Sequence, residues 1–99
     1  MVDLKPEQLK IVKNILSNYV ADFDVWVYGS RISGTAREYS DLDLVIVGKE
    51  ALSPHILNDL RDAFSNSDLT IMVDVHDWYK ISKEFQDIIK RKYEILQVK

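Results

Sequence analysis

The stretch VWVYGSRISGTAREYSDLDLVIV, residues 25–47, decides the fold of this 99-residue chain. It begins with a β-branched and aromatic run, residues 25–28, and ends with a continuous apolar run, residues 44–47. Both runs have the composition of strands in a sheet that is covered on both faces. The sequence therefore predicts two strands around which the rest of the chain is arranged.

Two aspartates, Asp41 and Asp43, precede the second run and lie one residue apart. Because side chains alternate across a strand, these two share a face with their Cα atoms roughly 7 Å apart, while Leu42 points to the other face. Both carboxylates are thus predicted to point at one spot. Taken alone, an Asp-x-Asp sequence is more often solvated or used to cap a backbone group.

Gly29 and Ser30 end the first run and open a short helix or a tight turn. Glycine lets the backbone approach a ligand closely, and free amides at Ser30 and Arg31 would offer donors and the positive end of a helix dipole to a phosphate. Taken alone, a Gly-Ser after a strand is usually an ordinary turn. Ten residues separate Ser30 from Asp41, with a strand on each flank. This combination indicates a site for a phosphate on one side and a metal on the other.

The rest of the chain predicts three helices, a third strand and a tail. Helices are expected after Pro6, after Ser53 and after Ser82, because each of these precedes apolar residues at three- and four-residue spacing. Residues 69–76 alternate as a strand, and residues 93–98 are extended, as an added edge strand or a partner contact. The apolar stripe of the first helix is predicted to contain Leu9, Val12, Leu16, Tyr19 and Val20.

Asp74 interrupts the third predicted strand. A carboxylate in mid-strand is costly to bury unpaired, so we expect it to meet a cation. Asp77 is the weaker rival, because it falls at the strand end before Trp78 and could simply cap the next turn. Converging carboxylates repel one another unless charge is supplied, and hard oxygen ligands select Mg²⁺ or Mn²⁺.

Composition limits the classes of function. The length and a hydrophobic content of 46% permit one domain over residues 1–99 and leave no room for a second. A net charge of -3 argues against a dedicated nucleic-acid binder, so direct nucleic-acid binding is not expected. The absence of cysteine excludes disulfides and thiolate metal sites, and no apolar run reaches membrane-spanning length. A cytoplasmic location is therefore expected.

Two short motifs carry a resemblance to a known family: Gly29-Ser30-Arg31 with Gly34, and Ser40-Asp41-Leu42-Asp43-Leu44. They resemble the G-S-R-x-x-G…S-D-x-D-L signature of the DNA polymerase β-like nucleotidyltransferase superfamily, specifically its minimal branch. The resemblance implies an α/β nucleotidyltransferase fold with a small mixed β-sheet flanked by helices. It departs from the common pattern at Ser33, where many minimal members have a second arginine, unless Arg37 takes that place.

The resemblance also implies roles for the site residues. Asp41 and Asp43 would hold the metal that bridges the triphosphate of ATP, and Asp74 would help to bind a second metal and activate the attacking hydroxyl. The nucleotide would be bound by Gly29, Ser30, Arg31 and Ser40. Within this set, the amides of Gly29 and Ser30 would bind the distal phosphates, and Arg31 would neutralise developing charge.

Minimal members are typically paired with a small helical protein of the HEPN (higher eukaryotes and prokaryotes nucleotide-binding) class, as antitoxin and toxin. The resemblance thus implies transfer of AMP from ATP to a tyrosine of such a partner, which silences its ribonuclease activity. The alternative is a binding module that neutralises its partner by contact alone and keeps the nucleotide site as a relic. Polymerisation of a nucleic acid is disfavoured by size and charge.

Overall fold

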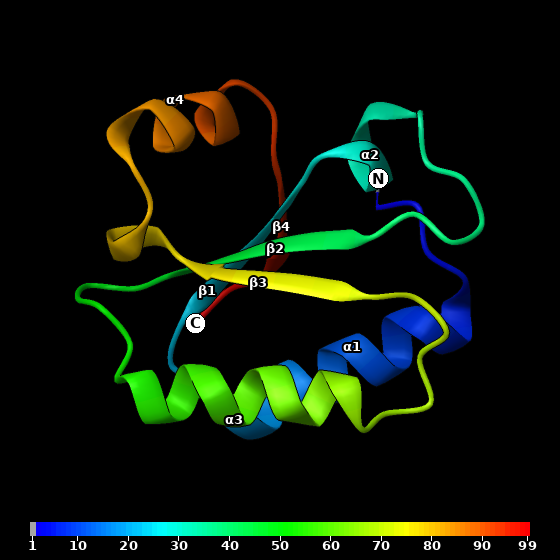
Figure 1. Cartoon of the computed structure of the whole chain (residues 1–99), viewed down its shortest axis with the longest axis horizontal. Coiled ribbons are helices and arrows are strands. Elements are labelled where there is room, and N and C mark those ends of the chain that lie inside the picture. The colour runs from blue at the N-terminus through cyan, green and yellow to red at the C-terminus, as the bar shows by residue number, and fades with distance from the viewer. Residues whose placement is uncertain (1) are drawn as a thin grey trace.

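The computed structural model describes residues 2–99 and contains a four-stranded mixed sheet with helices on both faces (Figure 1). The strands lie in the order β3-β2-β1-β4. β2 pairs antiparallel with β1 and parallel with β3, and β4 pairs antiparallel with β1. Their bounds are Asp24–Tyr28 for β1, Leu42–Val47 for β2, Val73–Asp77 for β3 and Glu94–Gln97 for β4. The predicted α/β fold with a mixed sheet is confirmed.

Helices α1 (Pro6–Tyr19) and α3 (Pro54–Ser65) cover one face of the sheet, whereas the short α2 (Ser30–Ser33) and α4 (Lys83–Arg91) lie on the other side (Figure 1). A 3-10 turn, η1 (Trp78–Lys80), leads from β3 toward α4. The predicted caps are present. The Ser53 hydroxyl accepts from the Ile56 amide at 3.3 Å, and the Ser82 hydroxyl accepts from the Phe85 amide at 3.1 Å.

The larger core lies between the sheet and the α1–α3 pair. It is built from alternate strand residues and from the apolar stripes of both helices, including Val12, Leu16, Val25, Val27, Leu44 and Leu60. The expectation for Tyr19 was wrong, since this side chain is 43% exposed. α1 ends at Tyr19 and the chain leaves helical geometry at Val20, whose predicted place in the core is confirmed.

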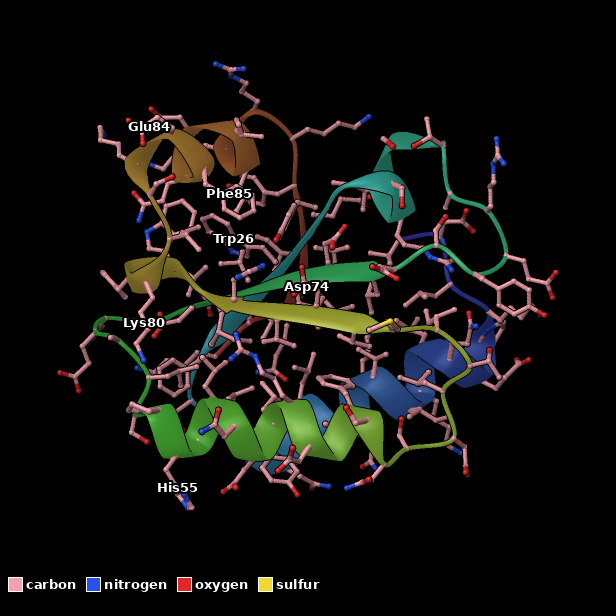
Figure 2. All side chains as sticks on the ribbon, in the orientation of Figure 1. Trp26, His55, Asp74, Lys80, Glu84 and Phe85 are labelled. Carbon is pink, nitrogen blue, oxygen red and sulfur yellow. The ribbon has the colours of Figure 1, made fainter. Side chains whose placement is uncertain are left out.

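A smaller cluster of Tyr28, Val45 and Ile89 lies under α4, with half-buried aromatic residues around it. Trp26 of β1 stacks on Tyr93 with ring centroids 4.1 Å apart and meets the edge of Trp78 at 5.4 Å. Trp26 and Phe85 lie between the sheet and α4 in Figure 2. Phe85 of α4 meets the edge of the Tyr28 ring of β1 with centroids 5.6 Å apart. This pair ties α4 to the sheet, because aromatic pairs in such geometries add to the energy of burial.

The third strand begins later than predicted. β3 begins at Val73 rather than at residue 69, because its parallel partner β2 begins at Leu42, which is in register with Val73. The tail forms the edge strand β4, one of the two forms expected for it. Within residues 2–99, no helix combines the length and the apolar character needed to cross a bilayer.

Candidate active site

A row of three polar side chains crosses β1, β2 and β3. Tyr28 is in register with Asp43, and Asp43 is in register with Asp74. Residues in register on neighbouring strands point to the same face and lie within reach of one another. That face is the one covered by α4, and Figure 2 shows Asp74 on this side of β3. The sheet thus brings Asp43 and Asp74 together on one face, as the sequence predicted.

The pKa values of Asp43 and Tyr28 reflect the burial of these side chains and their closeness to other acidic groups. Burial raises the pKa of Asp43, the negative charges of Asp74 and Asp41 raise it further, and His76 partly offsets the rise. Burial also raises the pKa of the Tyr28 hydroxyl, with smaller contributions from Asp43 and Asp74. The Tyr28 hydroxyl therefore keeps its proton at neutral pH. A cation placed among these carboxylates would relieve their mutual repulsion.

Gly29 brings the start of α2 against this row. Its backbone has φ 82° and ψ -153°, a conformation that essentially only glycine adopts. A Cβ atom at this position would lie 2.5 Å from Oδ2 of Asp43, too close for any side chain. The glycine is therefore required both by its backbone angles and by the Asp43 carboxylate beside it.

Arg31 of α2 is a buried charged residue, at 5% exposure. Its Nε and Nη2 donate to the carbonyl oxygen of Ser40 at 3.2 and 2.7 Å, Nη2 also donates to that of Glu38 at 3.1 Å, and Nη1 donates to that of Asp3 at 3.1 Å. The side chain thus fixes the segment that leads into Asp41. A direct contact with phosphate would require the guanidinium to exchange some of these bonds, and the implied contact stays a prediction.

Ser40 takes part in the same local structure. Its hydroxyl accepts from the amide of Arg37 at 2.8 Å, and its own amide donates to the Arg37 carbonyl oxygen at 3.1 Å. These bonds close a turn immediately before Asp41. The nucleotide contact expected of Ser40 also stays a prediction.

Asp41 lies just outside β2, which begins at Leu42, and is exposed. Its charge acts on Asp43, and the shared face predicted for the two carboxylates stays a prediction. In the described part of the chain, residues 2–99, no three acidic or histidine side chains lie close enough together to form a metal site by themselves. The carboxylate oxygens of Asp43 and Asp74 nonetheless fit a hard divalent cation, with Asp41 at the margin as a third donor.

His76 belongs to the site and was not singled out from the sequence. Its Nε2 lies 3.2 Å from Oδ2 of Asp74, and its ring meets the edge of Phe85 with centroids 5.6 Å apart. The available signal was its position two residues after Asp74, which puts both side chains on one face of a strand. His76 thereby links Asp74 to Phe85 of α4.

Asp77, the rival of Asp74, has a different role. It is 2% exposed and points to the opposite face, where its Oδ2 accepts from the Leu52 amide at 2.8 Å. Its Oδ1 accepts from the Tyr79 amide at 3.1 Å and so caps η1. The cap considered from the sequence is the role that the structure shows.

Comparisons with known proteins identify relatives of this chain. Residues 10–99 match the family model described as Polymerase beta, Nucleotidyltransferase. The chain is 46% identical over 98 residues to the probable protein adenylyltransferase MntA of Haemophilus influenzae, which covers 99% of this chain and 86% of that protein.

Solved structures share the fold at lower identity. A toxin–antitoxin structure with AMP-PNP has a TM-score of 0.76 at 18% identity, over 92% of this chain and 73% of that one. The toxin–antitoxin structure MntA–HepT has a TM-score of 0.63 at 13% identity, over 96% and 74%. A structure from Shewanella oneidensis has a TM-score of 0.68 at 15% identity, over 96% and 74%. The family match over residues 10–99 and the 46% identity to the Haemophilus influenzae protein show that this chain belongs to the polymerase beta nucleotidyltransferase family.

Proposed function

We propose that this chain is a metal-dependent adenylyltransferase that transfers AMP from ATP to a hydroxyl group of a partner protein. The observation that carries the proposal is the register of Asp43 with Asp74, with the Gly29 backbone packed against Asp43. Family membership and the 46% identity to a probable protein adenylyltransferase support the same reaction. The similar toxin–antitoxin structure with AMP-PNP supports an adenine nucleotide as the donor.

In the proposed reaction, Asp41, Asp43 and Asp74 would hold Mg²⁺ or Mn²⁺, which when bound would neutralise charge on the triphosphate and on these carboxylates. The acceptor oxygen forms a bond to the α-phosphorus. The bond from that phosphorus to the oxygen that bridges the α- and β-phosphates breaks, and pyrophosphate leaves. Asp74 takes the proton of the acceptor hydroxyl, helped by its exposure at the edge strand β3. Gly29 and Ser30 bind the distal phosphates through their backbone amides.

The proposed partner is a HEPN-type helical toxin, modified on a tyrosine, with this chain as its antitoxin. Support comes from the similar structures described as toxin–antitoxin complexes. We further infer a cytoplasmic location and a single domain over residues 1–99, as expected from the sequence.

A second candidate is a module that neutralises its partner by contact alone. The observation that favours it is the state of the arginines: Ser33 replaces the second motif arginine, and Arg31 is engaged with backbone carbonyl oxygens. Under this reading the site binds nucleotide weakly or not at all, and the partner is silenced without covalent change.

One experiment separates the two candidates. The purified chain is incubated with ATP, Mg²⁺ and the product of the adjacent reading frame, and the partner is analysed by mass spectrometry. We expect one or more added AMP masses with wild type and none with Asp41→Asn or Asp74→Asn. Asp62→Asn, an exposed change on α3 across the sheet, is the matched control and should behave as wild type. Full neutralisation of the partner by Asp41→Asn, with no mass change in any sample, would favour the contact-only module.

A further inference from the structure

The two histidines of the chain each lie 3.2 Å from an aspartate, but in different surroundings. Nε2 of His55 contacts Oδ2 of Asp59 on the outer surface of α3, where the His55 side chain is 84% exposed. Nε2 of His76 contacts Oδ2 of Asp74 on β3, and the His76 side chain is only 30% exposed. The surroundings therefore restrict the His76 ring far more than the His55 ring.

Packing from β2 and from α4 fixes the His76 ring. His76 is in register with Val45, a fully buried member of the cluster under α4. Phe85 reaches from α4 toward the sheet (Figure 2), and its ring meets that of His76 at 74° with centroids 5.6 Å apart. The other neighbour of Phe85 is Tyr28 of β1, at 84° and 5.6 Å. Three rings packed edge to face thus limit the rotamers open to the imidazole.

Asp74 has no comparable packing of its own. Its side chain is 55% exposed on the edge strand β3, and within residues 2–99 the contact with His76 is the one hydrogen bond of its carboxylate. An exposed carboxylate is free to rotate between rotamers, whereas a general base must stay within hydrogen-bond reach of the proton that it takes. The contact with His76 therefore decides which oxygen of Asp74 is turned toward the acceptor.

We propose that His76 is a positioning residue for AMP transfer: its Nε2–H donates to Oδ2 of Asp74 and leaves Oδ1 to receive the proton of the acceptor hydroxyl. This inference rests on the proposed function and adds to it the residue that orients the base. The imidazole takes no proton from the acceptor. It is held by Phe85, and it holds the carboxylate. Nε2 carries a hydrogen both in one neutral tautomer and in the charged ring, so the role does not depend on the charge of His76.

The test compares three substitutions of His76 with one of His55. Steady-state AMP transfer from Mg²⁺–ATP to the product of the adjacent reading frame is measured for wild type, His76→Ala, His76→Gln, His76→Asn and His55→Ala. The amide nitrogen of glutamine lies near the place of Nε2 and that of asparagine near the place of Nδ1, so only glutamine can restore the bond to Asp74. His55→Ala is the matched control, because it removes a histidine at the same distance from an aspartate on the other face of the sheet.

We expect His76→Ala and His76→Asn to lower kcat by roughly 10- to 100-fold, the usual cost of losing a residue that orients a catalytic group. KM for ATP should stay within about twofold of wild type, because Asp41 and Asp43 are unchanged. His76→Gln should recover most of the lost rate, and His55→Ala should equal wild type. A purely structural role of His76 would not produce this difference between glutamine and asparagine.

Phe85→Leu tests the packing that holds His76. Leucine keeps an apolar contact but removes the flat ring, so the single variant should lower kcat. In the His76→Ala background the same change should cause no further loss, because Phe85 acts on Asp74 through His76. Independent, multiplying losses would overturn this part of the assignment.

A second measurement needs neither metal nor nucleotide. Long-range 1H–15N NMR spectra of the wild-type chain show which ring nitrogens of each histidine carry a proton, and the signals that disappear in His76→Gln identify His76. We expect a proton on Nε2 of His76. A ring protonated at Nδ1 alone would overturn the inference, because Nε2 would then be an acceptor and could not hold a carboxylate.

Each remaining outcome is decisive. Equal kcat for His76→Ala and wild type would show that Asp74 needs no positioning residue, while the proposed transfer would still stand. A loss of Mg²⁺–ATP affinity in His76→Ala as large as in Asp43→Asn would make His76 a metal ligand instead. Equal activity of His76→Gln and His76→Asn would assign the loss to a general disturbance of β3. A wild-type chain that transfers no AMP would overturn the proposed function and this inference together.

Discussion

The Arg31 guanidinium donates two hydrogen bonds to one carbonyl oxygen, that of Ser40, from Nε at 3.2 Å and from Nη2 at 2.7 Å. Ser40 directly precedes Asp41, so a residue of α2 holds the entry to the strand that carries Asp43. The same side chain also binds the carbonyl oxygens of Glu38 and Asp3. One buried side chain therefore joins the first segment of the chain, α2 and the loop before β2.

Replacing Arg31 should destabilise the fold. Arg31→Ala leaves three carbonyl oxygens without their donor, at a cost of roughly 2–4 kcal/mol in the free energy of unfolding. Arg31→Lys should cost about half as much, because an ammonium group cannot reproduce the planar fork. Urea denaturation measures both. Arg37→Ala is the matched control, since its exposed side chain should matter by less than about 0.5 kcal/mol. Equal stability of Arg31→Ala and Arg37→Ala would show that these hydrogen bonds contribute nothing.

Gly29→Ala should be more harmful than Gly34→Ala, although both glycines have φ 82°. At Gly34 an added Cβ meets no atom within 4 Å, so only the backbone penalty of about 1 kcal/mol applies. At Gly29 the added Cβ also collides with Oδ2 of Asp43, which raises the expected cost to roughly 2–4 kcal/mol. Thermal unfolding checks the order, and a Gly29→Ala protein as stable as Gly34→Ala would contradict the close approach.

Loss of the charge at Asp77 should lower the stability of the fold, whereas loss of the charge at Asp74 should abolish AMP transfer. Asp77→Asn weakens one of two hydrogen bonds to backbone amides, of which the bond to Leu52 is buried, and should lower the free energy of unfolding by about 1–3 kcal/mol. Asp74→Asn, at an exposed position, should change stability by no more than about 0.5 kcal/mol while abolishing AMP transfer. Denaturation and the mass assay on the same two proteins test the assignment. The reverse pattern would exchange the roles of the two aspartates.

Asp43→Asn should weaken Mg²⁺–ATP binding by roughly tenfold or more, because the substitution keeps the shape of the side chain but removes the charge of one proposed ligand. Calorimetry with Mg²⁺ present gives the affinity, and Asp62→Asn on α3 is again the control. If Asp43→Asn and Asp62→Asn bound Mg²⁺–ATP equally well, the metal would not be held at Asp43.

The strands, the helix caps and the place of Asp74 could be predicted because they follow from local patterns. Alternation along the third strand predicts that Asp74 lies on the face opposite Val73 and Val75, and Ser53 and Ser82 are recognisable as helix caps from the sequence. The parts that escaped prediction depend on contacts distant in sequence. The bond from Arg31 to Asp3 spans 28 residues, and a groove lies between α2 and α4. No pattern in a single segment reports such contacts, so neither the backbone bonds of Arg31 nor the groove follows from the sequence, and the contact of Arg31 with phosphate stays a prediction.

The pH dependence of stability gives the last prediction. Burial beside Asp74 and Asp41 raises the pKa of Asp43 in the folded chain above its ordinary value of 3.8. Between these two pKa values the folded state binds more protons than the unfolded state. The contribution of Asp43 to the free energy of unfolding therefore falls as the pH rises through this window.

Asp43→Asn removes the titrating group itself, so the two proteins are compared at each pH. In EDTA, we expect wild type and Asp43→Asn to differ least below pH 3.8, where Asp43 is neutral in both states. The variant should become the more stable protein as the pH rises through the folded-state pKa, and it should keep that advantage to pH 7. Urea denaturation across pH 3 to 7 gives the difference at each point. A difference that stays constant with pH would show that Asp74 and Asp41 do not disfavour the charge on Asp43, and the crowded carboxylates would then provide no driving force for binding a cation.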